Sequence, residues 1–142
     1  MNFVKQNKKF NLAYKVPEDL ELVPISDYNK TKMISERVLL SYASEIPIVA
    51  LRPATVCGYS PRMRLDLTVS LLTMHALTSG RIRVFGGSQT RPNIHIKDMV
   101  GAYLYMIDEG ASLTGIYNTG FENLSVLEIA HQVQQVVPAE IV

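Results

Sequence analysis

The stretch IPIVALRP, residues 46–53, constrains the fold of this chain more than any other feature. It is short, almost wholly apolar and bounded by prolines. Such a run is typical of a β-strand that is buried on both faces of a sheet. Strands of this kind belong to parallel sheets that helices cover on both sides. The run therefore predicts an α/β protein.

Helical and extended patterns alternate over the rest of the sequence. Ile34 and Val38 recur at helical spacing after Asp27, which would serve as N-cap. Ser125 and Glu128 have the spacing of a capping box ahead of another apolar helix. We expect helices at about 28–44, 65–79, 98–108 and 126–137, strands at 46–53, 81–87, 94–96 and 115–120, and a polar loop at SQTRPN. This alternation also indicates an α/β fold.

Composition excludes several classes of function. The 142 residues suit one domain with a modest core, and the net charge of +1 gives no general case for a nucleic-acid or membrane-surface partner. No apolar run approaches the roughly 20 residues that span a bilayer, so we expect a cytoplasmic protein. A single cysteine, Cys57, excludes an internal disulfide and a cysteine cluster. The three histidines are too widely separated in sequence to suggest a metal site, so none is expected.

Tyr28 and Lys32 lie four residues apart, which places both side chains on one face of a helix. A phenol is a weak acid, and a neighbouring ammonium stabilises its phenolate, so such a pair can act as an acid and base near neutral pH. By spacing alone, the polar beginning of an amphipathic helix is the simpler interpretation.

Four segments favour the catalytic interpretation of the Tyr28–Lys32 pair, because they occur in a set order with sensible spacing. They are PEDLELVPISDYNKTKMISERVLLSY, IPIVALRPATVCGYSPR, IRVFGGSQTRPNIHIKDMVGAYLYMI and GIYNTGFENLSVLEIA. Together they resemble the extended short-chain dehydrogenase/reductase family, in particular NAD-dependent epimerases and dehydratases that act on nucleotide-linked sugars. The resemblance runs from about Pro17 to the end. It implies an incomplete Rossmann-like, doubly wound domain in residues 1–57 and a small α/β substrate-binding part in residues 58–142, which partly returns to the first domain.

The resemblance also implies roles for residues at matching positions. Tyr28 matches the catalytic tyrosine, which exchanges a proton with a sugar hydroxyl. Lys32 matches the lysine that holds the nicotinamide ribose of NAD and stabilises the phenolate. Pro53, Ala54 and Val56 match the segment whose backbone lies against the nicotinamide. Independently, ligands of open α/β sheets sit at the carboxyl ends of strands, where this segment is expected.

For the nucleotide-sugar substrate, the resemblance implies contacts from Thr55 and Arg91. Thr55 falls where many relatives have an asparagine, so it would be an altered contact. Arg91 matches an arginine that grips the diphosphate, and a guanidinium suits phosphate because it can donate two parallel hydrogen bonds. Arg62 and Arg64 flank the same region, but solvated loop residues are the simpler interpretation. His95 is interpreted as a structural histidine.

Two parts of the family pattern have no counterpart in this sequence. The family's Gly-x-x-Gly-x-x-Gly turn, which receives the dinucleotide pyrophosphate, is missing, because no glycine precedes Gly58. The serine or threonine that relatives place about two dozen residues before the tyrosine is also missing from MNFVKQNKK. We therefore expect a chain cut at both ends that does not bind NAD usefully alone.

Three interpretations of the function remain open. The chain is a fragment of an NAD-dependent epimerase or dehydratase, a non-catalytic truncated remnant, or a nucleotide-sugar binding module without redox activity. As partners we expect a nucleotide sugar and either a second copy of the chain or a chain that supplies the N-terminal half.

Overall fold

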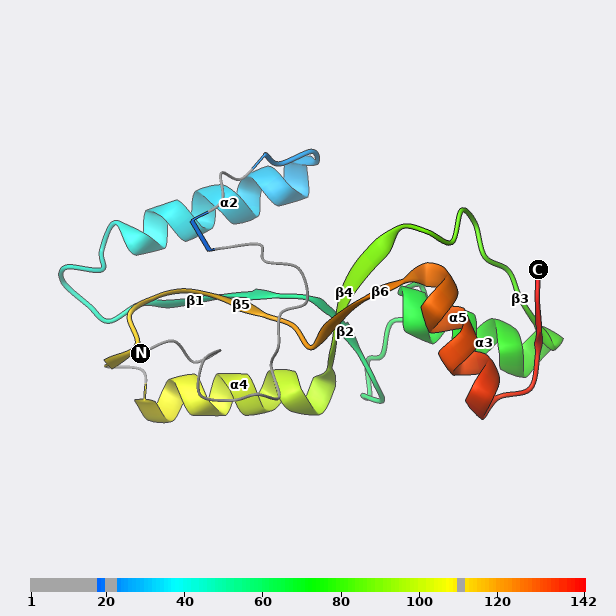
Figure 1. Cartoon of the computed structure of the whole chain (residues 1–142). Coiled ribbons are helices and arrows are strands. Elements are labelled where there is room, and N and C mark those ends of the chain that lie inside the picture. Colours follow the sequence, from blue (N-terminus) through cyan, green and yellow to red (C-terminus); the bar gives the residue numbers. More distant parts are fainter. Residues whose placement is uncertain (1–17, 20–22, 110–111) are drawn as a thin grey trace.

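The computed structural model describes residues 18–19, 23–109 and 112–142, which form two lobes side by side (Figure 1). The first lobe contains strands β1 (Val49–Pro53) and β5 (Gly115–Thr119), which pair in parallel. Helix α2 (Asp27–Leu40) lies along one face of this pair and helix α4 (Ile96–Glu109) along the other (Figure 1). Parallel strands between helices confirm the α/β fold class.

The second lobe is built on a three-stranded sheet in the order β2-β4-β6. Strands β2 (Thr55–Cys57) and β4 (Thr90–His95) are parallel, and β6 (Glu122–Ser125) runs antiparallel to β4. Helices α3 (Thr68–Ser79) and α5 (Val126–Val136) pack beside this sheet (Figure 1). The short strands β3 (Arg81–Ile82) and β7 (Glu140–Ile141) pair in parallel next to α3 and α5.

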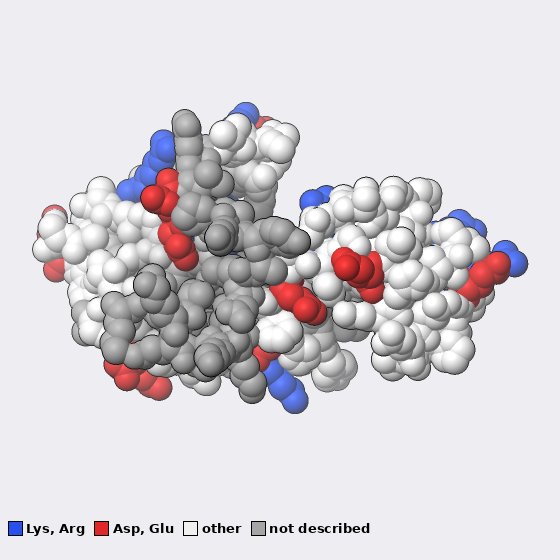
Figure 2. Space-filling view, viewed as in Figure 1, with Lys and Arg blue, Asp and Glu red and all other residues white. Residues whose placement is uncertain are grey.

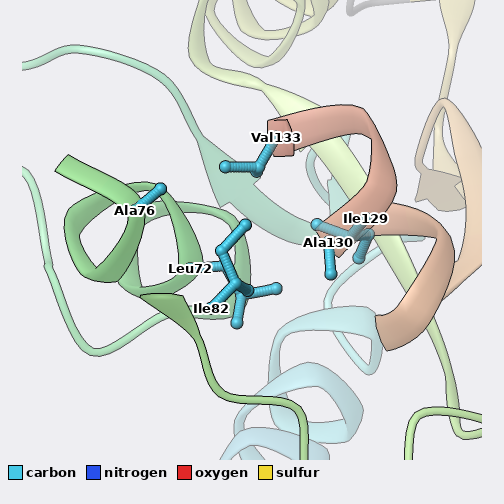
Figure 3. Packing of buried hydrophobic residues seen from close by; sticks show 6 residues of the cluster. All are labelled: Leu72, Ala76, Ile82, Ile129, Ala130 and Val133. Atoms are coloured by element: carbon cyan, nitrogen blue, oxygen red, sulfur yellow. The ribbon is translucent and has the colours of Figure 1, made fainter. Parts of the chain in front are cut away.

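The main apolar core lies between α3 and α5 in the second lobe. Its side chains point toward one another from the two helices and from β3 (Figure 3). Ile82 is fully buried, and burying an isoleucine side chain contributes about 1.5–3 kcal/mol. The core residues are Leu72, Ala76, Ile82, Ile129, Ala130 and Val133.

The ends of the two core helices follow their local sequences. The Ser125 hydroxyl accepts a hydrogen bond from the Glu128 amide at 3.2 Å, and the Glu128 carboxylate accepts one from the Ser125 amide at 2.7 Å. This confirms the predicted capping box at the start of α5. Helix α3 ends as expected at Gly80, whose φ of +63° lies in the left-handed region that glycine tolerates.

The first lobe has a thinner core. Met106 and Leu113 are buried, and Val49 and Leu51 of β1 pack against them. The strand predicted at IPIVALRP therefore exists. The prediction that both its faces are fully buried was wrong, because the residues of β1 are half-buried and Pro53 is exposed. The second face lies under α2, a helix in which no residue is buried.

Several predicted boundaries are corrected by tertiary contacts. Ser26, and not Asp27, caps α2, because its hydroxyl accepts a hydrogen bond from the Asn29 amide at 3.2 Å. Asp98 lies in the first turn of α4, which begins two residues earlier. Helix α2 ends sooner than expected, at Leu40, and α3 begins later, at Thr68.

The strands also differ from the sequence pattern. Most of the predicted polar loop SQTRPN belongs to β4, because pairing with β6 satisfies its backbone. The strand expected at 81–87 is limited to Arg81–Ile82. Strands β2, β6 and β7 were not predicted, since two to four residues are too few for a periodic signal.

Charged groups are dispersed over the molecular face shown in Figure 2, where blue and red side chains form no broad patch of one sign. Within the described ranges, none of the helices combines the length and apolar character that crossing a bilayer requires.

Candidate functional site

Tyr28 and Lys32 stand together at the amino end of α2. The Lys32 Nζ lies 5.5 Å from the centroid of the Tyr28 ring. Helix α2 runs opposite to β1, so its amino end lies over the carboxyl end of that strand (Figure 1). The Tyr28 side chain is exposed and accessible to a ligand. The structure thus places a cation beside a phenol at the edge where open α/β sheets bind ligands.

The segment from Pro53 to Val56 connects the two sheets at this edge. Strand β1 ends at Pro53, the Ala54 amide donates a hydrogen bond to the Thr119 carbonyl at 2.7 Å, and β2 begins at Thr55. Pro53 is exposed, while the other three residues are half-buried. The Ala54 amide is therefore already used within the fold, which leaves the exposed ring of Pro53 as the open part of the segment.

A small cavity of about 160 Å³ adjoins this segment. It is lined by Val56, Gly58, Ser60, Arg62, Met63, Arg64, Leu67, Ser70 and Ile96. The pKa of Arg64 is raised, chiefly by its hydrogen bonds to Asp66 and to a smaller extent by Tyr28. Two cationic side chains border the same edge as the Tyr28–Lys32 pair.

The sequence alone favours solvated loop residues at Arg62 and Arg64. Both side chains are indeed exposed, but the loop folds back so that they line a cavity with Val56. The available signal was the Arg-x-Arg spacing directly after the glycine-containing turn that follows a strand.

Gly58, which lines this cavity, is in close contact with the side chain of His95. A Cβ atom on Gly58 would lie 2.5 Å from His95 Nε2, and the φ of Gly58 is +105°. His95 Nδ1 accepts a hydrogen bond from the Lys97 amide at 3.2 Å. The histidine is exposed and contacts the backbone at Gly58 and Lys97, and its interpretation as a structural histidine stays a prediction.

Arg91 and Thr55 lie on neighbouring strands of the second lobe. Arg91 is exposed on β4, opposite Leu124 of β6, and Thr55 lies opposite Asn93. Arg91 is not among the described residues along the small cavity, which Arg62 and Arg64 line. The substrate roles of Arg91 and Thr55 stay predictions.

A larger cavity of about 480 Å³ lies between the three-stranded sheet and helices α3 and α5. Its walls are mainly apolar, and the described residues that line it include Asp98 and Glu122 but no lysine or arginine. A nucleotide diphosphate carries several negative charges, so this cavity does not suit it electrostatically.

The residues present fit one end of NAD. Tyr28 and Lys32 are exposed near the end of α2 that lies over the carboxyl end of β1, as a nicotinamide riboside would require. The described residues contain no glycine-rich turn between a strand and a helix for the pyrophosphate, and the segment MNFVKQNKK lies outside them. Within the described part of the chain, no three His, Cys, Asp or Glu residues gather into a group that could hold a metal ion.

Comparison with known proteins places these features in a family. The sequence profile of the NAD dependent epimerase/dehydratase family matches residues 13–120. An uncharacterized UDP-glucose epimerase, YtcB of Bacillus subtilis (strain 168), is 32% identical over 126 residues, which cover 86% of this chain and 39% of the relative.

Two solved structures are similar over most of the chain. A UDP-glucuronic acid 4-epimerase from Bacillus cereus, in complex with UDP-glucuronic acid and NAD, has a TM-score of 0.76 and 29% identity. The match covers 94% of this chain and 45% of the epimerase chain. TunA, an NAD-dependent NDP-hexosamine 5,6-dehydratase involved in tunicamycin biosynthesis, has a TM-score of 0.73 and 27% identity. The match covers 89% of this chain and 42% of the TunA chain. This chain thus spans less than half the length of these relatives.

Proposed function

The chain belongs to the NAD-dependent epimerase/dehydratase family, and from this premise we propose that it supplies the Tyr28–Lys32 pair of an enzyme acting on a nucleotide sugar. The observation that carries the proposal is the position of the Lys32 ammonium, 5.5 Å from the Tyr28 ring at the carboxyl end of β1. NAD is the cofactor of this family, and when bound it supplies the acceptor and donor of hydride.

Each residue of the pair has a distinct task in this proposal. The Tyr28 hydroxyl takes a proton from a sugar hydroxyl as that carbon is oxidised, and later returns it. The Lys32 ammonium stabilises the phenolate formed in between, because an opposite charge favours the ionised form of a neighbouring acid. It also donates hydrogen bonds to the ribose hydroxyls of the nicotinamide half. Both side chains are exposed, so neither task needs the helix to move.

The anionic part of the substrate requires cations near this pair. Arg62 and Arg64 line the small cavity together with Val56. Arg91 is exposed on β4 in the neighbouring lobe. Guanidinium groups bind phosphate oxygens through paired, charge-assisted hydrogen bonds. We assign the diphosphate to these arginines, with Arg91 as the matching family position and Thr55 as a further contact.

A second candidate is nucleotide-sugar binding without redox chemistry. The arginine-lined cavity favours it, because binding an anion there needs no cofactor. The two candidates predict different effects of the same substitutions. Only the enzyme requires the Tyr28 hydroxyl.

The test compares Tyr28→Phe with Arg91→Ala. The chain is assayed with NAD and UDP-glucose or UDP-glucuronic acid, alone and mixed with a separately expressed dinucleotide-binding half of the Bacillus subtilis relative. Tyr28→Phe should lower kcat by about two to four orders of magnitude, the usual worth of a positioned acid and base. Its affinity for the nucleotide sugar should barely change, because the proton transfer is used in the transition state. Arg91→Ala should weaken binding by about 1.5–3 kcal/mol.

Matched substitutions control for general effects on the surface. Tyr42→Phe removes the hydroxyl of an exposed tyrosine just beyond the end of α2, and Arg83→Ala removes an exposed arginine from the second lobe. Neither should alter turnover or binding. Unchanged turnover in Tyr28→Phe, together with weaker binding in Arg91→Ala, would favour the binding protein and refute the catalytic assignment.

A further inference from the structure

Helix α2 carries the Tyr28–Lys32 pair, yet apolar burial does little to hold it in place. None of its 14 residues is buried. Ile34 and Val38, which form its apolar stripe, are each more than half exposed. A helix of this length is marginal in water by itself. Its position over β1 must therefore depend on specific contacts.

One such contact joins the middle of α2 to β1. The Glu36 carboxylate accepts two hydrogen bonds from the Arg52 guanidinium, one from Nε at 2.8 Å and one from Nη2 at 2.6 Å. Both side chains are largely shielded from water, with 15% and 22% of their surfaces exposed. Two parallel, charge-assisted bonds fix both distance and orientation. A shielded pair of this kind is screened by salt much less than a surface ion pair.

Arg52 is also held from a second side. Its remaining terminal nitrogen donates to the Glu18 carbonyl at 2.9 Å. The Glu18 carboxylate accepts a hydrogen bond from the backbone amide of Asn118, the residue opposite Arg52 on β5, at 3.2 Å. The guanidinium therefore has a fixed orientation on the sheet, and the carboxylate of α2 docks onto a rigid group.

The Glu36–Arg52 ion pair lies close in sequence to the proposed functional residues on both of its elements, α2 and β1. Glu36 follows Lys32 by four residues, as Lys32 follows Tyr28, so all three lie on one face of α2. Arg52 directly precedes Pro53, the first residue of the segment assigned to the nicotinamide. Mutual stabilisation agrees with this geometry, because the hydrogen bonds with Arg52 lower the pKa of Glu36.

We propose that Glu36 and Arg52 are positioning residues, whose ion pair sets where Tyr28 and Lys32 stand relative to the Pro53–Val56 segment. The proposal rests on the proposed function of Tyr28 and Lys32. Neither Glu36 nor Arg52 touches substrate or cofactor in it. Displacing a reacting group by about 1 Å can cost about a hundredfold in rate.

The first part of the test needs no enzyme activity. Amide hydrogen exchange of the full chain is compared for the natural protein, Glu36→Gln and Glu140→Gln. The last variant makes the same change in the exposed Arg81–Glu140 ion pair of the second lobe. In Glu36→Gln, the amides of α2 should exchange about tenfold faster or more, while those of α5 keep their protection and report an intact fold. Glu140→Gln should leave α2 unchanged.

The second part separates positioning from stability. In the mixture that shows turnover, Glu36→Gln should lower kcat by about a hundredfold with KM for the nucleotide sugar unchanged. Glu36→Asp keeps the charge and should recover much of this loss. Unchanged exchange of α2 in Glu36→Gln overturns the proposal. Faster exchange with unchanged kcat also overturns it, because the pair would then only stabilise the helix.

Failure of the proposed function has a different signature. If the natural chain shows no turnover in any mixture, the catalytic assignment of Tyr28 and Lys32 fails, and positioning fails with it. Hydrogen exchange would still show whether the pair fastens α2. Loss of protection in both α2 and α5 of Glu36→Gln would show a global fold defect, and Arg52→Lys, which keeps the charge but loses the two parallel hydrogen bonds, then decides by the same two measurements.

Discussion

Replacing Gly58 with alanine should destabilise the protein more than an ordinary glycine substitution. Gly58 has a φ of +105°, and an added Cβ would lie 2.5 Å from His95 Nε2 and 2.8 Å from its Cδ2. Contacts between a Cβ and another heavy atom are essentially never shorter than 3.0 Å. The backbone, the histidine or both must therefore shift.

The size of the effect follows from two contributions. Forcing a residue with a Cβ into a positive-φ conformation costs roughly 1–2 kcal/mol. Moving the His95 ring endangers the hydrogen bond that its Nδ1 accepts from the Lys97 amide, which is worth about 0.5–1.5 kcal/mol. With the displaced packing around the ring, Gly58→Ala should lower the free energy of unfolding by about 2–4 kcal/mol.

Two other glycines separate these contributions in urea unfolding followed by circular dichroism. Gly80 has a φ of +63° but nothing within 4 Å of an added Cβ, so Gly80→Ala should show the backbone cost alone, about 1 kcal/mol. Gly101 lies inside α4 with open space around it, so Gly101→Ala should stabilise the protein by about 0.5–1 kcal/mol. The reasoning about His95 is refuted if Gly58→Ala costs no more than Gly80→Ala.

Two further predictions concern caps and charges. Ser125→Ala removes the cap hydroxyl of α5 and should lower the free energy of unfolding by about 1 kcal/mol; an unchanged urea midpoint would show that the capping box contributes nothing. The hydrogen bonds from Arg52 hold the pKa of Glu36 below its usual 4.5, so the ion pair stabilises the fold above that pH and loses its effect as pH falls through the lowered value. The stability difference between the natural chain and Glu36→Gln should therefore be constant near neutral pH and shrink as the pH falls below the usual value, whereas a difference that does not shrink on acidification would contradict this assignment.

Local signals predicted the features that depend on local geometry. The capping box at Ser125 was predictable because its two hydrogen bonds join residues three positions apart. The proximity of Lys32 to Tyr28 was predictable because a helix brings every fourth residue onto the same face. The end of α3 at Gly80 followed from the tolerance of glycine for positive φ.

Features that depend on distant segments were not predictable. The polar residues of β4 gave no strand signal, because their pairing is provided by β6, about 30 residues later. The half-burial of β1 depends on α2, whose apolar stripe does not pack tightly onto the strand. The position of Arg62 and Arg64 on the small cavity depends on the path of the loop after Gly58, which no periodicity encodes.

Over the residues that the structure describes, the chain passes between the two lobes three times, at Ala54, between His95 and Ile96, and at Gly120. The crossings are tied together, because the Ala54 amide bonds the Thr119 carbonyl at 2.7 Å and the Phe121 amide bonds the Asn93 carbonyl at 2.9 Å. Neither lobe is therefore one continuous piece of sequence. A single proteolytic cut therefore cannot release either lobe. Recombination with a relative can exchange one lobe only if the two sequences are compatible at all three junctions. Substrate specificity in this architecture should change by substitution within a lobe more readily than by transfer of a whole module.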